Sequence, residues 1–263
     1  MENISFIGCG SWGGALSKIL SDKNIRSTMW HRNSSIIEKM ENSRVHYMVP
    51  ELILSENVSF TNNLEHLIKN ASVIVLAIPS QTIRNVLEPH KHLINQDQII
   101  VNLAKGIETN SLLTISGVLK DILGEKFNNI VALSGPSHAE EVIFGHPTTL
   151  VSASENQESA GIIQELFSNN TLRTYKSNDI LGVELGGAMK NVIAIAAGIC
   201  DGIGYGDNSK AALLTRGMGE ISKLGMAMGA DPSTFQGLSG FGDLIVTCLS
   251  KHSRNRSVGQ AIG

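Results

Sequence analysis

The sequence predicts an α/β fold, in which a doubly wound parallel sheet is followed by an all-α-helical domain that is short at its C-terminus. Short apolar runs alternate with helical patterns over the first two-thirds of the 263 residues. Such alternation is typical of parallel strands joined by crossover helices on both faces of a sheet. After about residue 178 the strand signal ends and two long helical patterns follow. We therefore expect an α/β domain over residues 1–178 and a helical domain over residues 179–263.

Each expected strand is a short apolar run followed by glycine, proline or polar residues. The strands are expected at residues 4–8, 27–31, 58–60, 73–78, 99–103, 130–133, 149–153 and 172–175. The helices are expected at residues 12–23, 81–87, 159–167, 179–200 and 211–228, where apolar residues recur at helical spacing.

The composition narrows the function classes. Hydrophobic residues make up 42% of the chain and charged residues 17%, so a large core can form, and the formal net charge of -3 is too small to indicate a nucleic-acid or membrane partner. Cys9, Cys200 and Cys248 form no C-x-x-C pair and the histidines lack metal-ligand spacing, so we expect no disulfide framework and no metal. Because no apolar run approaches about 18 residues and no targeting segment is visible, we expect no membrane span and a cytoplasmic location.

A glycine motif joins the first strand to the first helix. Gly8, Gly10 and Gly13 frame Cys9, Ser11 and Trp12 in a G-x-G-x-x-G pattern. Glycines in this position allow a tight turn and let a pyrophosphate lie against the helix N-terminus. The motif predicts a Rossmann-type dinucleotide site, and the alternative is a glycine-rich turn without a ligand.

The end of the second strand bears on the choice of cofactor. NAD-specific sites usually carry a carboxylate here for the ribose hydroxyls, whereas this strand ends in Trp30, His31 and Arg32. A guanidinium suits a 2′-phosphate and can stack on adenine. We therefore expect NADP(H), with NAD(H) or dual use as the alternative, unless Arg32 only covers the sheet surface.

Two lysines are candidates for chemistry. Lys105 follows a strand in Ala104-Lys105-Gly106, where it would face an anionic ligand, although a solvated surface lysine has the same pattern. Lys190 lies inside an apolar helix beside the small residues Gly186, Gly187, Ala194 and Ala197, which we expect to leave a pocket above it. A partly buried lysine has a lowered pKa and can give a proton to a ketone oxygen during hydride transfer. The equal alternative is a lysine that snorkels from a packed helix.

Two further segments carry polar groups suited to ligands. Ser137 and Glu140 have capping-box spacing, so we expect a helix that begins there, either simply capped or facing a phosphate or a nicotinamide amide. Asp243 is expected in a glycine-flanked loop as an orienting group. A basic stretch follows it, in which Ser253 caps a helix and Arg254 and Asn255 form a phosphate clamp. A solvated patch is the alternative, and the stretch is too short to favour nucleic acid.

Together these motifs resemble the bacterial NAD(P)-dependent glycerol-3-phosphate dehydrogenases, whose order they follow along nearly the whole chain. The resemblance implies a Rossmann domain joined to a helical domain with the substrate between them. It implies reversible, NAD(P)H-dependent reduction of dihydroxyacetone phosphate to sn-glycerol 3-phosphate, which supplies phospholipid synthesis. A homodimer is left open. Other readings are a reductase of a hydroxy acid or nucleotide sugar with the same plan, and a non-catalytic dinucleotide sensor.

The resemblance also implies roles for single residues. The residues expected at the cofactor are Gly8, Gly10, Ser11, Trp12, Gly13, His31, Arg32, Tyr47, Lys105, Ala139 and Arg254. Those expected at the substrate are Lys105, Gly135, Ser137, Lys190, Asp243, Ser253, Arg254 and Asn255. Lys190 is expected to donate the proton and Asp243 to support it. The family continues with further helices, one bearing an acidic cofactor contact, whereas this sequence ends at Gly263, so we expect weak or no activity from this chain.

Overall fold

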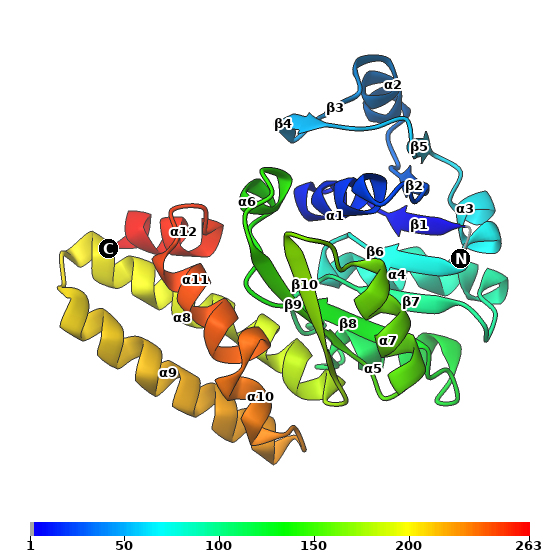
Figure 1. The fold of residues 1–263 in the computed structure, drawn as a ribbon. Coiled ribbons are helices and arrows are strands. Elements are labelled where there is room, and N and C mark those ends of the chain that lie inside the picture. The colour runs from blue at the N-terminus through cyan, green and yellow to red at the C-terminus, as the bar shows by residue number, and fades with distance from the viewer. Residues whose placement is uncertain (1–2) are drawn as a thin grey trace.

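The computed structural model describes residues 3–263, which form one eight-stranded sheet, a small hairpin and twelve α-helices (Figure 1). The strand order in the sheet is β10-β9-β8-β7-β6-β1-β2-β5. The strands are β1 (Ile4–Ile7), β2 (Ser27–Trp30), β5 (Val58–Thr61), β6 (Val73–Leu76), β7 (Ile99–Asn102), β8 (Ile130–Ser134), β9 (Thr148–Ala153) and β10 (Leu172–Ser177). All eight expected strands are confirmed to within about three residues at their ends.

The sheet departs from the expected parallel arrangement at one edge. Six neighbouring strands, from β5 to β8, are parallel, but β9 runs antiparallel to β8 and β10 is parallel to β9. The short helix α6 (Ala139–Ile143) is the only regular element between β8 and β9. Five helical residues rise about 7.5 Å, too little to return the chain to the far end of the sheet. The ten-residue α7 (Gln157–Leu166) does return it, so β10 is parallel to β9.

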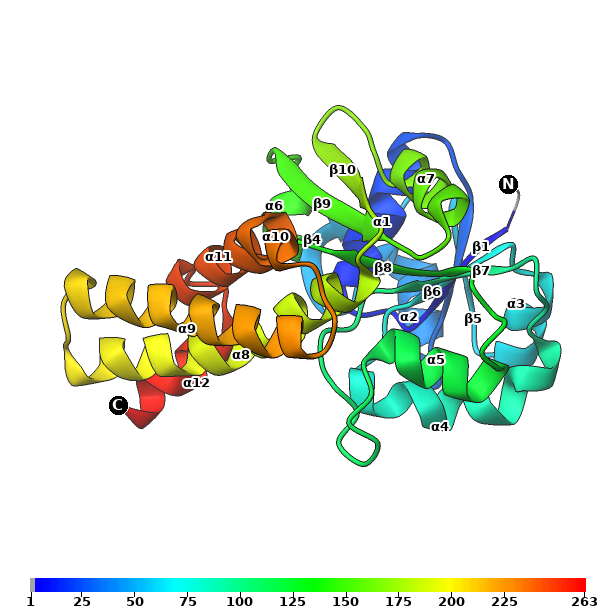
Figure 2. The ribbon, with the colours of Figure 1, turned by 90° about the horizontal axis from the view of Figure 1, so that it is seen from below.

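Helices cover both faces of the sheet (Figure 2). Alternate strand residues divide between two cores, with Ile4 and Phe6 in one and Ile7 in the other. The first core lies under α1 (Ser11–Asp22), α2 (Ser34–Ser43), α6 and α7, and the second lies under α3 (Leu64–Asn70), α4 (Ile83–Leu87) and α5 (Ile115–Leu123). This two-sided cover explains why the strands are nearly continuous apolar runs.

Polar caps begin most of the longer helices. The side chains of Asn33, Asn156, Asp179 and Ser253 accept hydrogen bonds from backbone N–H groups in the first turns of α2, α7, α8 and α12. Such a cap satisfies donors that the helix itself leaves free. Local sequence therefore sets where these helices start.

The helical part is built on α8 (Ile180–Ile203), which begins against the sheet and continues away from it (Figure 1). Beside it lie α9 (Asp207–Ala227), α10 (Pro232–Gln236), the π-helical turn η3 (Leu238–Gly242), α11 (Asp243–Leu249) and α12 (Arg254–Ile262). By length and composition α8 could cross a membrane, but 56% of its most apolar window is buried inside the protein. Because it also buries Glu184 and Lys190, α8 is a core helix.

Some local structure was not expected. The predicted helix at residues 81–87 is divided into a 3-10 turn, η1 (Ser80–Thr82), and α4, and a second 3-10 segment, η2 (Glu88–Leu93), follows. A hairpin of β3 (Val45–His46) and β4 (Val49–Ile53) stands apart from the main sheet. The hairpin has only two paired positions and a bulge, so it lacks the regular alternation that would reveal it in the sequence.

Candidate active site

Two lysines from different parts of the fold meet at one buried carboxylate. Lys190, in the middle of α8, is 5% exposed and donates hydrogen bonds to Asp243 Oδ1 and to Thr247 Oγ1, the latter over 2.6 Å. Lys105, just after β7, donates from Nζ to Asp243 Oδ2 over 2.6 Å and to the carbonyl of Gly135 over 3.3 Å. Asp243 is 1% exposed. The Lys190 side chain therefore points into the protein at the carboxyl edge of the sheet, and it does not snorkel.

This arrangement makes Lys190 an unusual acid. Burial, together with the neighbouring charge of Lys105, lowers the pKa of Lys190 to about 7, while Asp243 acts in the opposite direction. Near neutral pH, Lys190 can thus be either an ammonium or a free amine. Such a group can release or take up a proton at little free-energy cost.

The glycine motif forms a tight strand-to-helix turn. Gly8 has φ +109°, and a Cβ there would lie 2.5 Å from the carbonyl oxygen of Ala77. A Cβ on Gly13 would lie 2.9 Å from Ala77 Cβ, so this glycine lets α1 pack closely on the residue that follows β6. In contrast, a Cβ on Gly10, the N-cap of α1, would meet only the Ala77 oxygen at 3.6 Å. The open side of the turn, next to Ser11 and Trp12, fits a pyrophosphate at the N-terminus of a twelve-residue helix.

Aromatic rings gather at the end of β2. His31 and Tyr47 meet edge to face with ring centroids 5.6 Å apart, although sixteen positions separate them in the chain. Arg32 beside them is exposed. His46 is 1% exposed; its Nδ1 accepts from Met48 N, so its Nε2 donates to the carbonyl of Cys9 over 3.1 Å. The β3–β4 hairpin thus joins His31 to the glycine motif, and His31, Tyr47 and the neighbouring Arg32 can hold the adenosine end of a dinucleotide.

The segment after β8 lies beside the lysines, but it is not capped as expected. Ser137 Oγ donates to the carbonyl of Gly135 over 3.0 Å, and α6 begins at Ala139 with His138 as its N-cap. The predicted capping box of Ser137 and Glu140 is therefore wrong, because the Ser137 hydroxyl is already used within the turn. Gly135 and Ala139 are buried, and Ser137 is half-buried.

The end of the chain contributes the basic segment. Ser253 is the N-cap of α12, where its Oγ accepts from Arg256 N over 3.2 Å, as expected. Arg254 is exposed and Asn255 half-buried in the first turn. The rings of His252 and His138 lie 5.7 Å apart, so this segment faces the turn that carries Ser137. The nine-residue α12 can present its N-terminus, with Arg254 and Asn255, to a phosphate.

Comparison with known proteins shows the same two-part architecture. A protein-family model described as "NAD-dependent glycerol-3-phosphate dehydrogenase N-terminus" matches residues 3–160, and the model of the C-terminus of the same family matches residues 179–263. The chain belongs to this dehydrogenase family. It is 48% identical to glycerol-3-phosphate dehydrogenase [NAD(P)+] of Fusobacterium nucleatum and 50% identical to that of Bacillus licheniformis, over all of this chain and 79% and 77% of those proteins. A crystal structure of glycerol-3-phosphate dehydrogenase from Coxiella burnetii has a TM-score of 0.93 at 33% identity, over 99% of this chain and 80% of that one.

Two expectations about this dehydrogenase site need correction. Asp243 does not lie in a loop: it is the first residue of α11, directly after η3, because the glycines around it form a π-helical turn. The small residues of α8 do not leave an open pocket either. A Cβ on Gly186 would lie 2.7 Å from the carbonyl of Ser239, and Ala194 and Ala197 are fully buried in the helical core. Gly186 therefore serves close packing, whereas Gly187 faces the Lys105 side chain and lines only a small cavity of about 10 Å³.

Sequence reasoning missed three polar residues of the site. Thr247 lies one helical turn after Asp243, and its hydroxyl accepts from Lys190 while donating to the carbonyl of Asp243. The spacing of four on one helix was the only available signal for Thr247. His46 and Glu184, both buried, gave no signal, because each is a single polar residue whose partners are far away in the chain.

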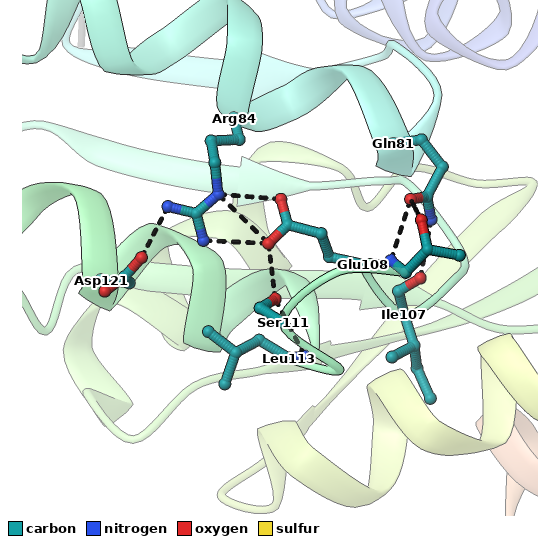
Figure 3. Close-up of polar contacts among 8 residues, drawn as sticks. Gln81, Arg84, Ile107, Glu108, Ser111, Leu113 and Asp121 are labelled. Carbon is teal, nitrogen blue, oxygen red and sulfur yellow. Dashed lines mark hydrogen bonds and ion pairs between the residues drawn. The ribbon is translucent and has the colours of Figure 1, made fainter.

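A polar network fixes the loop that follows Lys105 (Figure 3). Arg84 donates to both carboxylate oxygens of Glu108 over 2.9 to 3.1 Å, and it also pairs with Asp121. The side chain of Gln81 donates to Ile107 O and accepts from Thr109. These contacts tie the segment after β7 to the segment after β6.

Proposed function

We propose that this chain catalyses the NAD(P)H-dependent, reversible reduction of dihydroxyacetone phosphate to sn-glycerol 3-phosphate. The observation that carries the proposal is the buried Lys190 ammonium, which Asp243 joins to Lys105 at the carboxyl edge of the sheet. The family relationship supports the substrate, and the open glycine turn supports the dinucleotide. A function in supplying glycerol 3-phosphate for phospholipid synthesis, within the cytoplasm, belongs to the same proposal.

The residues divide the work as follows. The cofactor, when bound, supplies a hydride to the ketone carbon. Lys190 gives its proton to the ketone oxygen as that oxygen gains charge, and takes the proton back in the reverse direction. Asp243 holds the Lys190 Nζ in place, and Lys105 keeps a positive charge near the oxygen. Ser253, Arg254 and Asn255 hold the phosphate, while Gly135 and Ser137 line the substrate.

The cofactor would be held between the glycine turn and the carboxyl edge of the sheet. Its pyrophosphate would be held by Gly8, Gly10, Ser11, Trp12 and Gly13, its adenosine end by His31, Arg32 and Tyr47, and its nicotinamide by Ala139. Lys105 and Arg254 would contact both the cofactor and the substrate. The exposed Arg32 guanidinium favours NADP(H) over NAD(H), because it can pair with a 2′-phosphate.

Lys190→Met tests the reaction directly. We expect kcat for dihydroxyacetone phosphate reduction to fall by about 10²–10⁴, the usual contribution of a general acid, while the NADPH dissociation constant is unchanged. Turnover and fluorescence titration with NADPH measure the two effects. A chain that binds NADPH but shows no turnover even as wild type would indicate a dinucleotide sensor and refute the proposed reaction.

Two structural proposals accompany the function. We place the boundary between the dinucleotide domain, 1–178, and the substrate domain, 179–263, at the start of α8, which limited proteolysis can check. A homodimer, suggested by the family resemblance, can be tested by sedimentation.

A further inference from the structure

Glu184 is a buried carboxylate that the proposed chemistry does not use. It lies on α8, six residues before Lys190, and is 6% exposed. Its oxygens accept from Ser116 N over 3.0 and 3.2 Å, from Ser116 Oγ over 2.5 Å and from Asn102 Nδ2 over 3.0 Å. Three elements therefore meet at this carboxylate: α8, the first turn of α5 and the end of β7. Burial raises the pKa of Glu184 in spite of these donors, so the group is kept in a costly place.

Asn102 extends the contact to the other lysine. Its Oδ1 accepts from Ala104 N over 2.8 Å, and its Nδ2 donates to Ala104 O over 3.1 Å as well as to Glu184. The Asn102 side chain thus holds the backbone of Ala104, just before Lys105, by two hydrogen bonds. Asn102, Lys105, Glu184 and Gly187 line one small cavity of about 10 Å³, so Glu184 lies in the wall behind Lys105.

The hydrogen bonds of Glu184 fix the position of α8 on the sheet more closely than apolar contacts do. The N-terminal part of α8 also packs on the sheet through Ile180 and Val183, which would tolerate a small slide or rotation of the helix. The hydrogen bonds of Glu184 are directional, so they would break if α8 moved in this way. Lys190 is about 9 Å further along the same helix, and a rotation of α8 would carry its Nζ away from Asp243.

We propose that Glu184, together with Asn102, is a positioning residue that sets the placement of both Lys105 and Lys190 around Asp243. One carboxylate thereby couples the helix that carries the proton donor to the strand end that carries the second cation. The kinetic consequence rests on the proposed function, but the placement of the lysines does not.

Gln98 offers a matched control at the other end of the same strand. It is 2% exposed, its Nε2 donates to the carbonyls of Ile68 and Ala71 over 2.7 Å each, and its Oε1 accepts from Asn95 N. Gln98→Leu removes a buried polar tether of similar extent that does not contact either lysine or Asp243. Loss of stability alone should therefore affect the Gln98 and Glu184 variants alike.

The test compares Glu184→Gln with Gln98→Leu in the full chain, without ligand. Competitive acetylation with acetic anhydride between pH 6 and 9, read by mass spectrometry, reports the reactivity of Lys105 and Lys190 separately. We expect Glu184→Gln to change the labelling of both lysines by about threefold or more, the effect of a half-unit change in pKa, and Gln98→Leu to leave it unchanged. Unchanged labelling in Glu184→Gln, or equal changes in both variants, would overturn the inference.

Kinetics and a milder variant complete the experiment. If the chain reduces dihydroxyacetone phosphate, Glu184→Gln should lower kcat by about 10- to 100-fold and leave the KM for NADPH nearly constant. If the wild-type chain shows no turnover, the proposed function fails, while the labelling still tests the positions of the lysines. Should Glu184→Gln not fold, Ser116→Ala removes one donor and should shift the labelling in the same direction by less; no shift would refute the inference.

Discussion

At the scale of single residues, the site depends on how one carboxylate divides its two oxygens. Asp243 gives Oδ1 to Lys190 and Oδ2 to Lys105, so the two cations are held apart although both approach the same group. Lys190 is the more deeply buried of the two lysines, and this burial lowers its pKa to about 7. Burial, rather than any special chemistry of the side chain, therefore suits Lys190 to the proposed role of proton donor.

The pH dependence of turnover should follow Lys190. Reduction needs the ammonium, so kcat for reduction should fall as pH rises through about 7, and oxidation, which needs the free amine, should rise over the same range. Asp243→Asn removes the charge that raises the pKa of Lys190, so the pH at which kcat changes should move to a lower value. Profiles of kcat in both directions measure this. Limbs that stay in place in Asp243→Asn would show that another group titrates.

The phosphate clamp can be tested at Arg254. Arg254→Ala should raise the KM for dihydroxyacetone phosphate by about ten- to over a hundredfold, the loss of a charge-assisted contact of about 1.5–3 kcal/mol. The KM for NADPH should change far less. Lys251→Ala, an exposed cation three residues earlier, serves as the control for a general loss of positive charge. Equal effects of the two substitutions would remove Arg254 from the clamp.

At the scale of elements, loops between strand and helix are fixed by a few strong polar contacts. The Arg84–Glu108 pair is the clearest: side-chain exposures are 23% and 10%, and three short hydrogen bonds join the two groups. Arg84 and Ser111 together lower the pKa of Glu108. The local sequence indicates a turn around Glu108, but it does not reveal that Arg84 is the partner that holds this turn.

The stability due to Glu108 should depend on pH. Because the folded pKa is lowered, the contribution is present above the unfolded pKa of about 4.3 and is lost as pH falls through the folded value. Glu108→Gln should lower the free energy of unfolding by about 2 kcal/mol at pH 7, with the difference shrinking towards pH 3. Urea titrations at several pH values measure it. Glu155→Gln, in an exposed pair with Lys120, should cost less than about 1 kcal/mol; a difference for Glu108→Gln that does not change with pH would contradict the assignment.

At the scale of the whole molecule, α8 connects the sheet to every element of the helical part. Its first turn packs in the sheet core, and its later turns contact α9, α11 and α12. The contact with α12 is backbone to backbone: a Cβ on Gly198 would lie 2.0 Å from the carbonyl of Arg256. The position of the start of α12, where we propose the phosphate clamp, therefore depends on a glycine far from it in the chain.

Gly198→Ala should separate the effects on the two ligands. The added methyl group should displace α12, lower the melting temperature and raise the KM for dihydroxyacetone phosphate. The NADPH dissociation constant should change little, because the glycine turn belongs to the sheet part of the fold. Gly219→Ala, on α9 with nothing within 4 Å of its added Cβ, should be neutral or slightly stabilising. Thermal unfolding and steady-state kinetics check both, and similar behaviour of the two variants would refute the close packing.

The sequence by itself determined the strands, the longer helices, the glycine turn and the lysines worth examining, because these depend on residues within about one or two turns of each other. Tertiary structure alone decided that β9 reverses, that the small face of α8 is packed closed, and that Thr247, His46 and Glu184 belong to the site. Lys105 and Lys190 bond to Asp243 across 138 and 53 positions of the chain. No local pattern encodes such contacts, since they form only when the sheet and helices have packed.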